Sequence, residues 1–203
     1  MFVVVIAGNI GAGKSTTMQA LQQLLTDYRV CFVMEPVNEW RAQGFLEEFY
    51  KTGNAFEFQL RVLYSRVTAY ERSLEEYALA HAGEQPEVVL LDRWFFEDRE
   101  FARVNLARGA MTDKQFALYE TAYAYLNKHY PIPDFSVWLD VAPEVCFDRL
   151  KQRGRPEEVA GITLEYLQQL DAVRSQYGTC LDVANQTPLD VALHISKFIY
   201  SFL

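Results

Sequence analysis

Residues 8–15 have the spacing of a phosphate-binding loop. They match the pattern G-x-x-x-x-G-K-[ST], in the order Gly8, Asn9, Ile10, Gly11, Ala12, Gly13, Lys14 and Ser15. Glycines let consecutive backbone N–H groups surround a phosphate, and a helix that begins there adds partial positive charge. We expect Lys14 to reach the outer phosphates and Ser15 to ligate Mg²⁺, with Thr16 inside the same nucleotide site. The pattern therefore predicts that the chain binds a nucleotide.

Acidic residues follow three short apolar runs, at the points where parallel strands would end. They are Glu35, Asp92 and Asp140. The carboxyl ends of such strands form the ligand site of open α/β sheets. Asp92 is followed by the cation Arg93, which could face a transferring phosphoryl group. We therefore assign Asp92 to the metal and expect Asp140 to cap the next helix.

Glu35 offers a second kind of chemistry. A carboxylate beside a phosphate site can take a proton from an attacking hydroxyl group. The simpler interpretation is a helix cap or a surface salt bridge. The interpretation as a proton acceptor is favoured by the sequence that surrounds this residue, Glu35-Pro36-Val37-Asn38-Glu39-Trp40.

The elements that must position these residues alternate between strand and helix patterns. We expect strands at 2–7, 30–34, 88–91, 135–139 and 180–184. We expect helices at 16–25, 55–80, 95–107, 113–128, 143–152, 164–177 and 188–202. Thr112 and Gln115 fit a capping box for the helix at 113–128. Five strands alternating with helices predict an α/β fold in which a parallel sheet is covered on both faces, within a single domain over residues 1–203.

Composition limits the partners and the compartment. The chain has 203 residues and a formal net charge of −8, which does not favour nucleic acid or an anionic membrane as a partner. Cys31, Cys146 and Cys180 are odd in number and lack C-x-x-C spacing, so we expect reduced, buried thiols. The apolar N-terminus lacks the basic segment of a signal peptide, and no apolar run could span a membrane. These features favour a cytoplasmic protein.

The motifs occur in an order that resembles the deoxyribonucleoside kinases, the family that contains deoxycytidine, deoxyguanosine and deoxyadenosine kinases. The resemblance rests on the phosphate loop, Glu35-Pro36-Val37 with Trp40, Phe58-Gln59, Asp92-Arg93 and the arginine-rich segment 149–158. That last segment is most similar to bacterial or viral members. The resemblance implies a P-loop kinase fold of three α/β/α layers with an arginine-rich lid. It also implies ATP and Mg²⁺ as cofactors, a deoxynucleoside as the small-molecule substrate, and a homodimer.

The resemblance also implies a role for each matching residue near the phosphates. Glu35 would accept the proton of the nucleoside 5′-hydroxyl, and Arg93 would lie near that oxygen. Asp92 stands where the family often has Glu, so its shorter side chain would reach Mg²⁺ through water. The lid would close over the phosphates through Arg149, Arg153 and Arg155. The simpler interpretation of this arginine cluster is a solvated helix end.

The nucleoside pocket follows from the same resemblance. Tyr50 and Glu158 would hold the 3′-hydroxyl, and Gln59 would bind the edge of the base. The remaining pocket residues would be Trp40, Val62, Arg66, Asp98 and Phe101. Gln59 also has a simpler interpretation as a satisfied core amide.

Two positions depart from the family pattern. Trp94 stands where the family usually has Ser. Ala102 stands where the family has a stacking Phe, with Phe101 one place earlier. The sequence pattern therefore does not decide which aromatic ring covers the base.

The expected activity is transfer of the γ-phosphoryl group of ATP to a deoxynucleoside 5′-hydroxyl. Arg66 and Asp98 favour deoxycytidine or a purine deoxynucleoside over thymidine, because a carboxylate can accept from an exocyclic amine and thymine offers a carbonyl there. The alternatives are a nucleoside monophosphate kinase of the thymidylate type and a GTPase switch or non-catalytic nucleotide-binding module. A monophosphate acceptor needs no base such as Glu35, and the guanine motif N-K-x-D is missing from the sequence.

Overall fold

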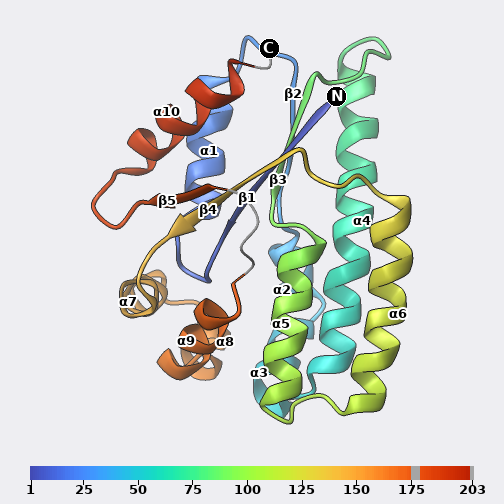
Figure 1. The fold of residues 1–203 in the computed structure, drawn as a ribbon, viewed down its shortest axis with the longest axis vertical. Helices are drawn as coiled ribbons and strands as arrows, with labels where there is room; N and C mark the ends of the chain where they lie inside the picture. Colours follow the sequence, from blue (N-terminus) through green and yellow to red (C-terminus); the bar gives the residue numbers. More distant parts are fainter. Residues whose placement is uncertain (175–178, 202–203) are drawn as a thin grey trace.

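The computed structural model describes residues 1–174 and 179–201. Its centre is a five-stranded parallel sheet with the strand order β2-β3-β1-β4-β5 (Figure 1). The strands are β1 (Phe2–Gly8), β2 (Val30–Val33), β3 (Val88–Asp92), β4 (Phe135–Asp140) and β5 (Thr179–Asp182). β1 lies between β3 and β4, with Phe2 opposite Val88 and Val4 opposite Phe135. The expected α/β class and parallel sheet are confirmed.

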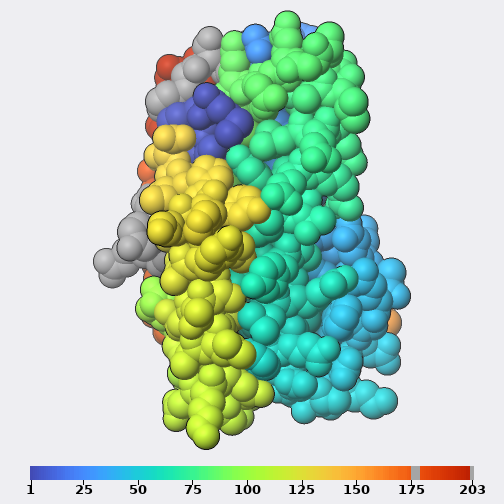
Figure 2. Space-filling model, turned by 90° about the vertical axis from the view of Figure 1, so that its right-hand side faces the viewer, coloured from blue at the N-terminus to red at the C-terminus, as the bar shows by residue number. Residues whose placement is uncertain are grey.

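Helices cover both faces of the sheet. One face packs with α2 (Val37–Ala42), α3 (Phe45–Thr52), α4 (Ala55–Ala80), α5 (Phe95–Ala107) and α6 (Asp113–His129). The other packs with α1 (Lys14–Leu24), α7 (Pro143–Arg153), α9 (Leu164–Ala172) and α10 (Pro188–Ile199). Because strand side chains alternate, Val3 and Val5 of β1 point into the first core and Val4 and Ile6 into the second. α4 and α6 form one side of the molecule (Figure 2).

Local sequence signals set several of these boundaries. The hydroxyls of Thr112, Thr163 and Thr187 each accept a hydrogen bond from the backbone N–H three residues on, at the starts of α6, α9 and α10. The expected capping box at Thr112 and Gln115 is present. Before β4, Asp134 Oδ2 accepts from the N–H of Val3 at 2.8 Å, which ties the start of β4 to β1.

The expected strands and most helices agree with the structure to within two residues at each end. The helix expected at 164–177 ends at Ala172 as α9, and residues 175–177 lie outside the described part of the chain. α10 ends at Ile199, and residue 202 is also outside it. Three short helices were not expected: α2, α3 and α8 (Pro156–Gly161). In the described residues, no helix has the length and apolarity needed to cross a membrane.

Two expectations about single residues were wrong. Asp140 does not cap α7, because the N-cap is Ala142 and the Asp140 carboxylate pairs with Arg174 at 2.6 Å. Cys31 and Cys146 are buried as expected, but Cys180 is exposed. It lies on β5, the edge strand of the sheet, where one side of the strand has no neighbour to cover it.

Candidate active site

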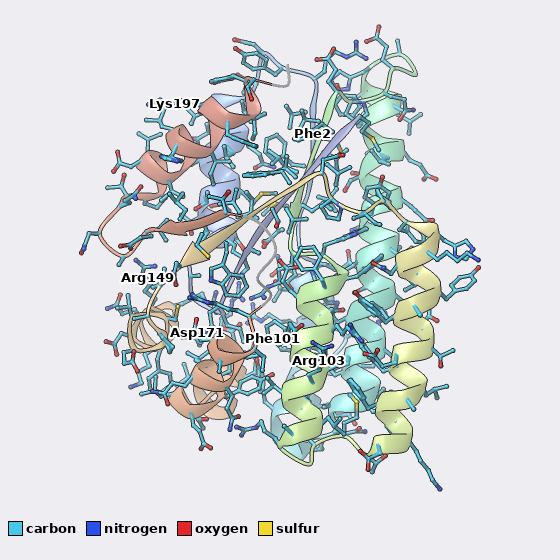
Figure 3. The ribbon with its side chains drawn as sticks, in the orientation of Figure 1. Phe2, Phe101, Arg103, Arg149, Asp171 and Lys197 are labelled. Carbon is cyan, nitrogen blue, oxygen red and sulfur yellow. The ribbon has the colours of Figure 1, made fainter. Side chains whose placement is uncertain are left out.

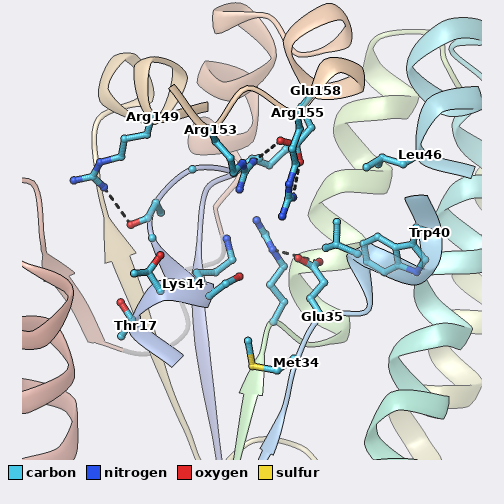
Figure 4. A pocket seen from close by; sticks show the side chains of 18 of the residues that line it. Lys14, Thr17, Met34, Glu35, Trp40, Leu46, Arg149, Arg153, Arg155 and Glu158 are labelled. Carbon is cyan, nitrogen blue, oxygen red and sulfur yellow. Dashed lines mark hydrogen bonds and ion pairs between the residues drawn. The ribbon is translucent and has the colours of Figure 1, made fainter. Parts of the chain in front are cut away.

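The predicted site residues come together at the carboxyl ends of the parallel strands. The phosphate loop follows β1, Glu35 follows β2, and Asp92 ends β3. In Figure 3, Phe2 marks the start of β1, and Phe101 and Arg149 lie toward the opposite end. A cavity of about 890 Å³ opens there, between the phosphate loop, α2–α4 and the lid (Figure 4). Every predicted site residue lines it except Gly8, Asn9 and Asp92, which lie behind the lining.

The phosphate loop has the backbone shape that its glycines permit. Gly11 and Gly13 have φ values of 87° and 102°, in the left-handed region that favours glycine. A Cβ atom at Gly11 would lie 2.5 Å from the carbonyl oxygen of Cys146 on α7, so this glycine is also required for packing. The Asn9 side chain donates to the Leu167 carbonyl at 2.9 Å and links the loop to α9.

The Lys14 side chain folds back onto the phosphate loop. Its Nζ donates to the carbonyls of Gly8 and Asn9, at 3.2 and 2.9 Å. Burial, and then the positive charge of Arg93, lower the pKa of Lys14 to about 8. Lys14 therefore remains mostly protonated at neutral pH, as phosphate binding requires.

Ser15 and Asp92, the two residues expected to hold the metal, are in direct contact. The Ser15 hydroxyl donates to Asp92 Oδ2 at 2.9 Å. Asp92 Oδ1 is buried and has no hydrogen-bond partner among the described residues. Burial and the nearby negative charge of Glu35 raise the pKa of Asp92. A hydroxyl and a carboxylate that needs a positive partner fit Mg²⁺, which usually binds one or two protein oxygens together with substrate phosphates and water.

Glu35 is the centre of a network of buried charges. Its Oε1 accepts from Arg66 Nη2 at 2.7 Å and lies 3.7 Å from Arg93 Nε. Burial opposes ionisation of Glu35, but Arg66, Arg93 and Lys14 together outweigh it and lower the pKa of Glu35. The carboxylate is thus unprotonated at neutral pH and able to accept a proton.

Arg66 connects this network to Asp98. Its Nε lies 3.3 Å from Asp98 Oδ1, and its Nη1 donates to the Asp92 carbonyl at 3.3 Å. Burial raises the pKa of Asp98 to about 6 despite Arg66. The second oxygen of Asp98, Oδ2, has no hydrogen-bond partner among the described residues. The predicted pair therefore forms, and Arg66 also binds Glu35, which the sequence analysis did not anticipate.

Arg93 has an unusual backbone conformation. Its φ is 69°, in the left-handed region, which costs a residue with a side chain roughly 1–2 kcal/mol. Its guanidinium lies 4.8 Å from the centre of the Phe101 ring. Phe101 thus contacts Arg93 from within the cavity wall, whereas Ala102 is fully buried in the core and does not line the cavity. Trp94 is also buried, and its indole N–H donates to the Pro131 carbonyl at 3.0 Å.

Aromatic side chains build the pocket beyond Glu35. Phe58 stacks on Phe49 with ring centres 4.7 Å apart, and Trp40 meets Phe58 edge-on at 5.8 Å. Gln59 is buried and its Nε2 donates to the Asp98 carbonyl at 3.2 Å. The expected residues Tyr50 and Val62 line the same pocket.

The lid, which runs from the arginine-rich end of α7 through α8 (Pro156–Gly161), crosses the mouth of the cavity. Glu158 is buried and accepts from Arg153 at 2.5 Å and from Arg155 at 3.0 Å (Figure 4). Arg149 Nη1 donates to the carbonyl of Ala12 in the phosphate loop at 3.3 Å. The arginines therefore face the site, and neither Arg149 nor Arg153 makes the alternative pair with Asp148 or Glu157.

Two contacts join the lid to the helices opposite it. Glu157 of α8 pairs with Arg41 of α2. Gly161, at the end of α8, lies against Tyr50: a Cβ atom there would come within 2.4 Å of the Tyr50 ring. The lid is thus seated on α2 and α3 at both ends of α8.

Several lining residues were missed by the sequence analysis. On α3, α4 and α9 they are Leu46, Phe49, Phe58 and Tyr166. Near α10 they are Val183, Gln186, Pro188 and Val191. Phe58 stood in a motif that was recognised, and its neighbour Gln59 could have pointed to it. The others carry no motif. Most of them are apolar or aromatic, and such side chains look the same in sequence whether they line a cavity or fill a core.

Comparison with known proteins agrees with this geometry. The profile of the family described as deoxynucleoside kinase matches residues 4–201. This chain belongs to that family. A deoxynucleoside kinase is a phosphotransferase that uses ATP, so the thymidylate-type and non-catalytic alternatives are set aside.

Individual members of the family show the same similarity. The chain is 28% identical over 196 residues to a deoxyadenosine kinase of Dictyostelium discoideum, covering 97% of this chain and 73% of the relative. It is 32% identical over 189 residues to the deoxycytidine kinase of Homo sapiens, covering 81% and 70%. It is 30% identical over 171 residues to a deoxyguanosine kinase of Dictyostelium discoideum, covering 83% and 56%. These relatives are named for three different bases, so similarity alone does not select the base.

Proposed function

We propose that this deoxynucleoside kinase transfers the γ-phosphoryl group of ATP to the 5′-hydroxyl of deoxycytidine or a purine deoxynucleoside, in preference to thymidine. The observation that carries the proposal is the placement of the Glu35 carboxylate beside Arg93, at the edge of the phosphate loop, with Arg66 and Asp98 next to it.

The donor side holds and neutralises phosphates. Backbone N–H groups of residues 9–16 and the Lys14 ammonium would bind the phosphates of ATP. Ser15 and Asp92 would hold Mg²⁺, which would supply positive charge to the phosphates when bound. Arg149 and Arg153 approach from the lid and would stabilise the charge on the phosphoryl group during transfer.

The acceptor side supplies the general base, Glu35. Glu35 would accept the proton of the 5′-hydroxyl as that oxygen attacks the γ-phosphorus. Arg93 lies beside Glu35 and would pair with the phosphoryl oxygens. Positioning and charge stabilisation account for most of the catalysis in reactions of this type.

The sugar would be held from the lid and from α3. Tyr50 and Glu158 both line the cavity, and we assign them to the 3′-hydroxyl. Arg153 and Arg155 orient the Glu158 carboxylate through hydrogen bonds. Recognition of the sugar would therefore depend on closure of the lid.

The base would meet Gln59, Arg66 and Asp98 between aromatic walls. Asp98 Oδ2 lacks a hydrogen-bond partner, and the exocyclic amine of cytosine or adenine could supply one. Thymine would present a carbonyl to that carboxylate and leave it unpaired, at a cost of about 1–3 kcal/mol. Arg66 could donate to the guanine carbonyl, so guanine fits the proposal as well. These contacts support an amino-bearing base over thymine.

The test is a panel of steady-state assays with ATP and Mg²⁺. We would measure kcat/KM for deoxycytidine, deoxyadenosine, deoxyguanosine and thymidine, with thymidine monophosphate as a separate acceptor. We expect thymidine to be at least tenfold poorer than the best of the other three, and no turnover of the monophosphate. A preference for thymidine would overturn the base assignment, and turnover of the monophosphate would overturn the role of Glu35.

A further inference from the structure

Glu97 is a buried carboxylate that the proposed mechanism does not use. It lies in the first turn of α5 and is only 2% exposed. Its Oε2 accepts a hydrogen bond from the backbone N–H of Trp94 at 2.9 Å. Its Oε1 is buried and has no hydrogen-bond partner among the described residues. A buried carboxylate with an unpaired oxygen is unfavourable for folding, so its presence at this position calls for a reason.

The peptide group that Glu97 binds directly follows Arg93. Arg93 adopts the left-handed conformation described above, which persists only where the surroundings hold it in place. Its own N–H donates to the Ile6 carbonyl at 3.2 Å, and the carbonyl of Asp92 accepts from Arg66. Glu97 fixes the next N–H along the chain. The backbone is therefore anchored on both sides of Arg93.

The side chain of Arg93 is held from the same helix. Phe101 lies four residues after Glu97, one helical turn further along α5. The Arg93 guanidinium rests on the Phe101 ring, at 4.8 Å from its centre. Arg93, Glu97 and Phe101 also line one small cavity behind the phosphate loop, together with Gly8 and Asn9. One face of α5 thus contacts both the backbone and the side chain of Arg93.

We propose that Glu97 is a positioning residue, which fixes the N–H of Trp94 and so keeps Arg93 in the left-handed conformation that directs its guanidinium toward Glu35 and the transferring phosphoryl group. The inference rests on the proposed function, because that function gives Arg93 its role. Without the Glu97 hydrogen bond, residue 93 would relax toward ordinary backbone angles. Its Nε would then leave its position 3.7 Å from Glu35.

The ordinary explanation is that Glu97 only helps α5 to begin. A glutamate or glutamine three residues into a helix often bonds back to the N-cap N–H in this way. α6 provides a matched case, since Gln115 Oε1 accepts from the Thr112 N–H at 2.8 Å and neither residue lines the active-site cavity. Loss of the Gln115 bond therefore measures what a helix cap alone contributes.

The experiment compares Glu97→Met, Glu97→Gln and Gln115→Ala by steady-state kinetics with saturating ATP. Methionine fills similar volume without an acceptor oxygen, whereas the glutamine amide can accept the same bond. We expect Glu97→Met to lower kcat at least tenfold, with KM for the deoxynucleoside changed less than threefold, and Glu97→Gln to restore kcat to within threefold of wild type. Gln115→Ala should leave kcat unchanged. A kcat for Glu97→Met as high as that of Gln115→Ala would overturn the proposal.

A double-mutant cycle with Arg93→Ala tests whether Glu97 acts through Arg93. If it does, adding Glu97→Met to Arg93→Ala should change kcat less than twofold, because the side chain it positions is gone. Full multiplication of the two effects would overturn the proposal. Arg93→Ala alone reports on the proposed function separately, since an unchanged kcat there would remove Arg93 from catalysis. Should the methionine variant not fold, Glu97→Leu, whose side chain also lacks an acceptor oxygen, gives the same comparison.

Discussion

One carboxylate oxygen of Glu35 lies close to two arginine side chains. Arg66 donates to it directly and Arg93 lies slightly further away, while Lys14 adds a third positive charge nearby. These charges keep the carboxylate ionised in a buried place where it would otherwise bind a proton. In the proposed mechanism, this ionised carboxylate can take the proton only when the substrate hydroxyl is held against it.

Replacement of Glu35 by glutamine should therefore preserve the fold and nucleotide binding but lower kcat. The amide keeps the size of the side chain and cannot accept the proton, and loss of a general base typically costs about 10²- to 10⁴-fold in rate. Steady-state kinetics and ATP titration of the same preparation check both parts. Turnover near that of wild type would remove Glu35 from the mechanism.

The pair Arg66 and Asp98 should set the preference against thymidine. The double variant Arg66→Met with Asp98→Ala removes the unpaired carboxylate, so we expect thymidine use relative to deoxycytidine to rise by about tenfold or more. The measurement is the ratio of kcat/KM for the two nucleosides, which is insensitive to a general loss of active enzyme. An unchanged ratio would show that the pair only joins two helices.

Sequence spacing predicted some contacts between residues and could not predict others. The phosphate loop was predictable because its glycines and lysine work over eight consecutive positions. The contact of Arg66 with Glu35 was not, because it joins α4 to the segment after β2, and only the packing of α4 on the sheet brings them together. The contact of the Phe101 ring with the Arg93 guanidinium was not predictable either, because no sequence pattern indicates that the two side chains meet.

At the scale of elements, the Glu97 carboxyl at the start of α5 should make the free energy of unfolding depend on pH. Burial raises the pKa of Glu97 to about 7, although the Trp94 N–H and Arg93 oppose the rise. The folded protein thus binds this proton more tightly than the unfolded chain does. Its contribution to stability is complete below about pH 4.5 and is lost as the pH rises through 7.

Relative to Glu97→Gln, the wild type should therefore lose roughly 2–3 kcal/mol of unfolding free energy between pH 5 and pH 8. The measurement is denaturant unfolding of both proteins at several pH values. Asp98 and the other titrating groups are present in both proteins, so their effects cancel in the difference. Parallel pH profiles would mean that Glu97 titrates normally.

The lid should depend on Gly161 for recognition of the sugar. In Gly161→Ala the new methyl group would collide with the Tyr50 ring and displace the lid or the tyrosine. We expect the ratio of kcat/KM for a deoxynucleoside over its 2′,3′-dideoxy analogue to fall about tenfold, the value of one or two hydrogen bonds. Val159→Ala, on the exposed side of the same helix, is the matched control. Equal loss on both substrates would place the effect elsewhere than at the 3′-hydroxyl.

Long elements were predictable and short ones were not. α4 shows one apolar face over 26 residues, and the β1 run directly precedes the glycine loop. α2 and α8 have only six residues each, fewer than two turns, so no periodic pattern can develop. Yet these short helices carry Trp40 and Glu158, and the contact between them seats the lid on the cavity.

At the scale of the whole molecule, α4 and α6 present apolar side chains to solvent. Tyr64 is 51% exposed, Leu118 57% and Tyr125 60%. Leu118 and Tyr125 are seven residues apart, so they lie on one side of α6. We propose that this side is the interface of a homodimer.

Sedimentation velocity should therefore show a dimer for the wild type. Leu118→Glu combined with Tyr125→Glu should give a monomer, because two carboxylates would be buried without partners in the interface. Leu189→Glu combined with Leu193→Glu places the same two charges on exposed positions of α10 and should leave the dimer intact. A wild-type monomer would exclude this assembly.

The position of β1 at the centre of the sheet also governs the order of assembly during synthesis. Its neighbour β4 begins far along the chain, and the hydrogen bond from Val3 to Asp134 joins residues 131 positions apart. At 5–20 residues per second a ribosome needs roughly 7–26 s to cover that distance. During this interval the most apolar strand of the protein has no partner on that side. The pairing of β1 with β4 is therefore a late step in folding during synthesis.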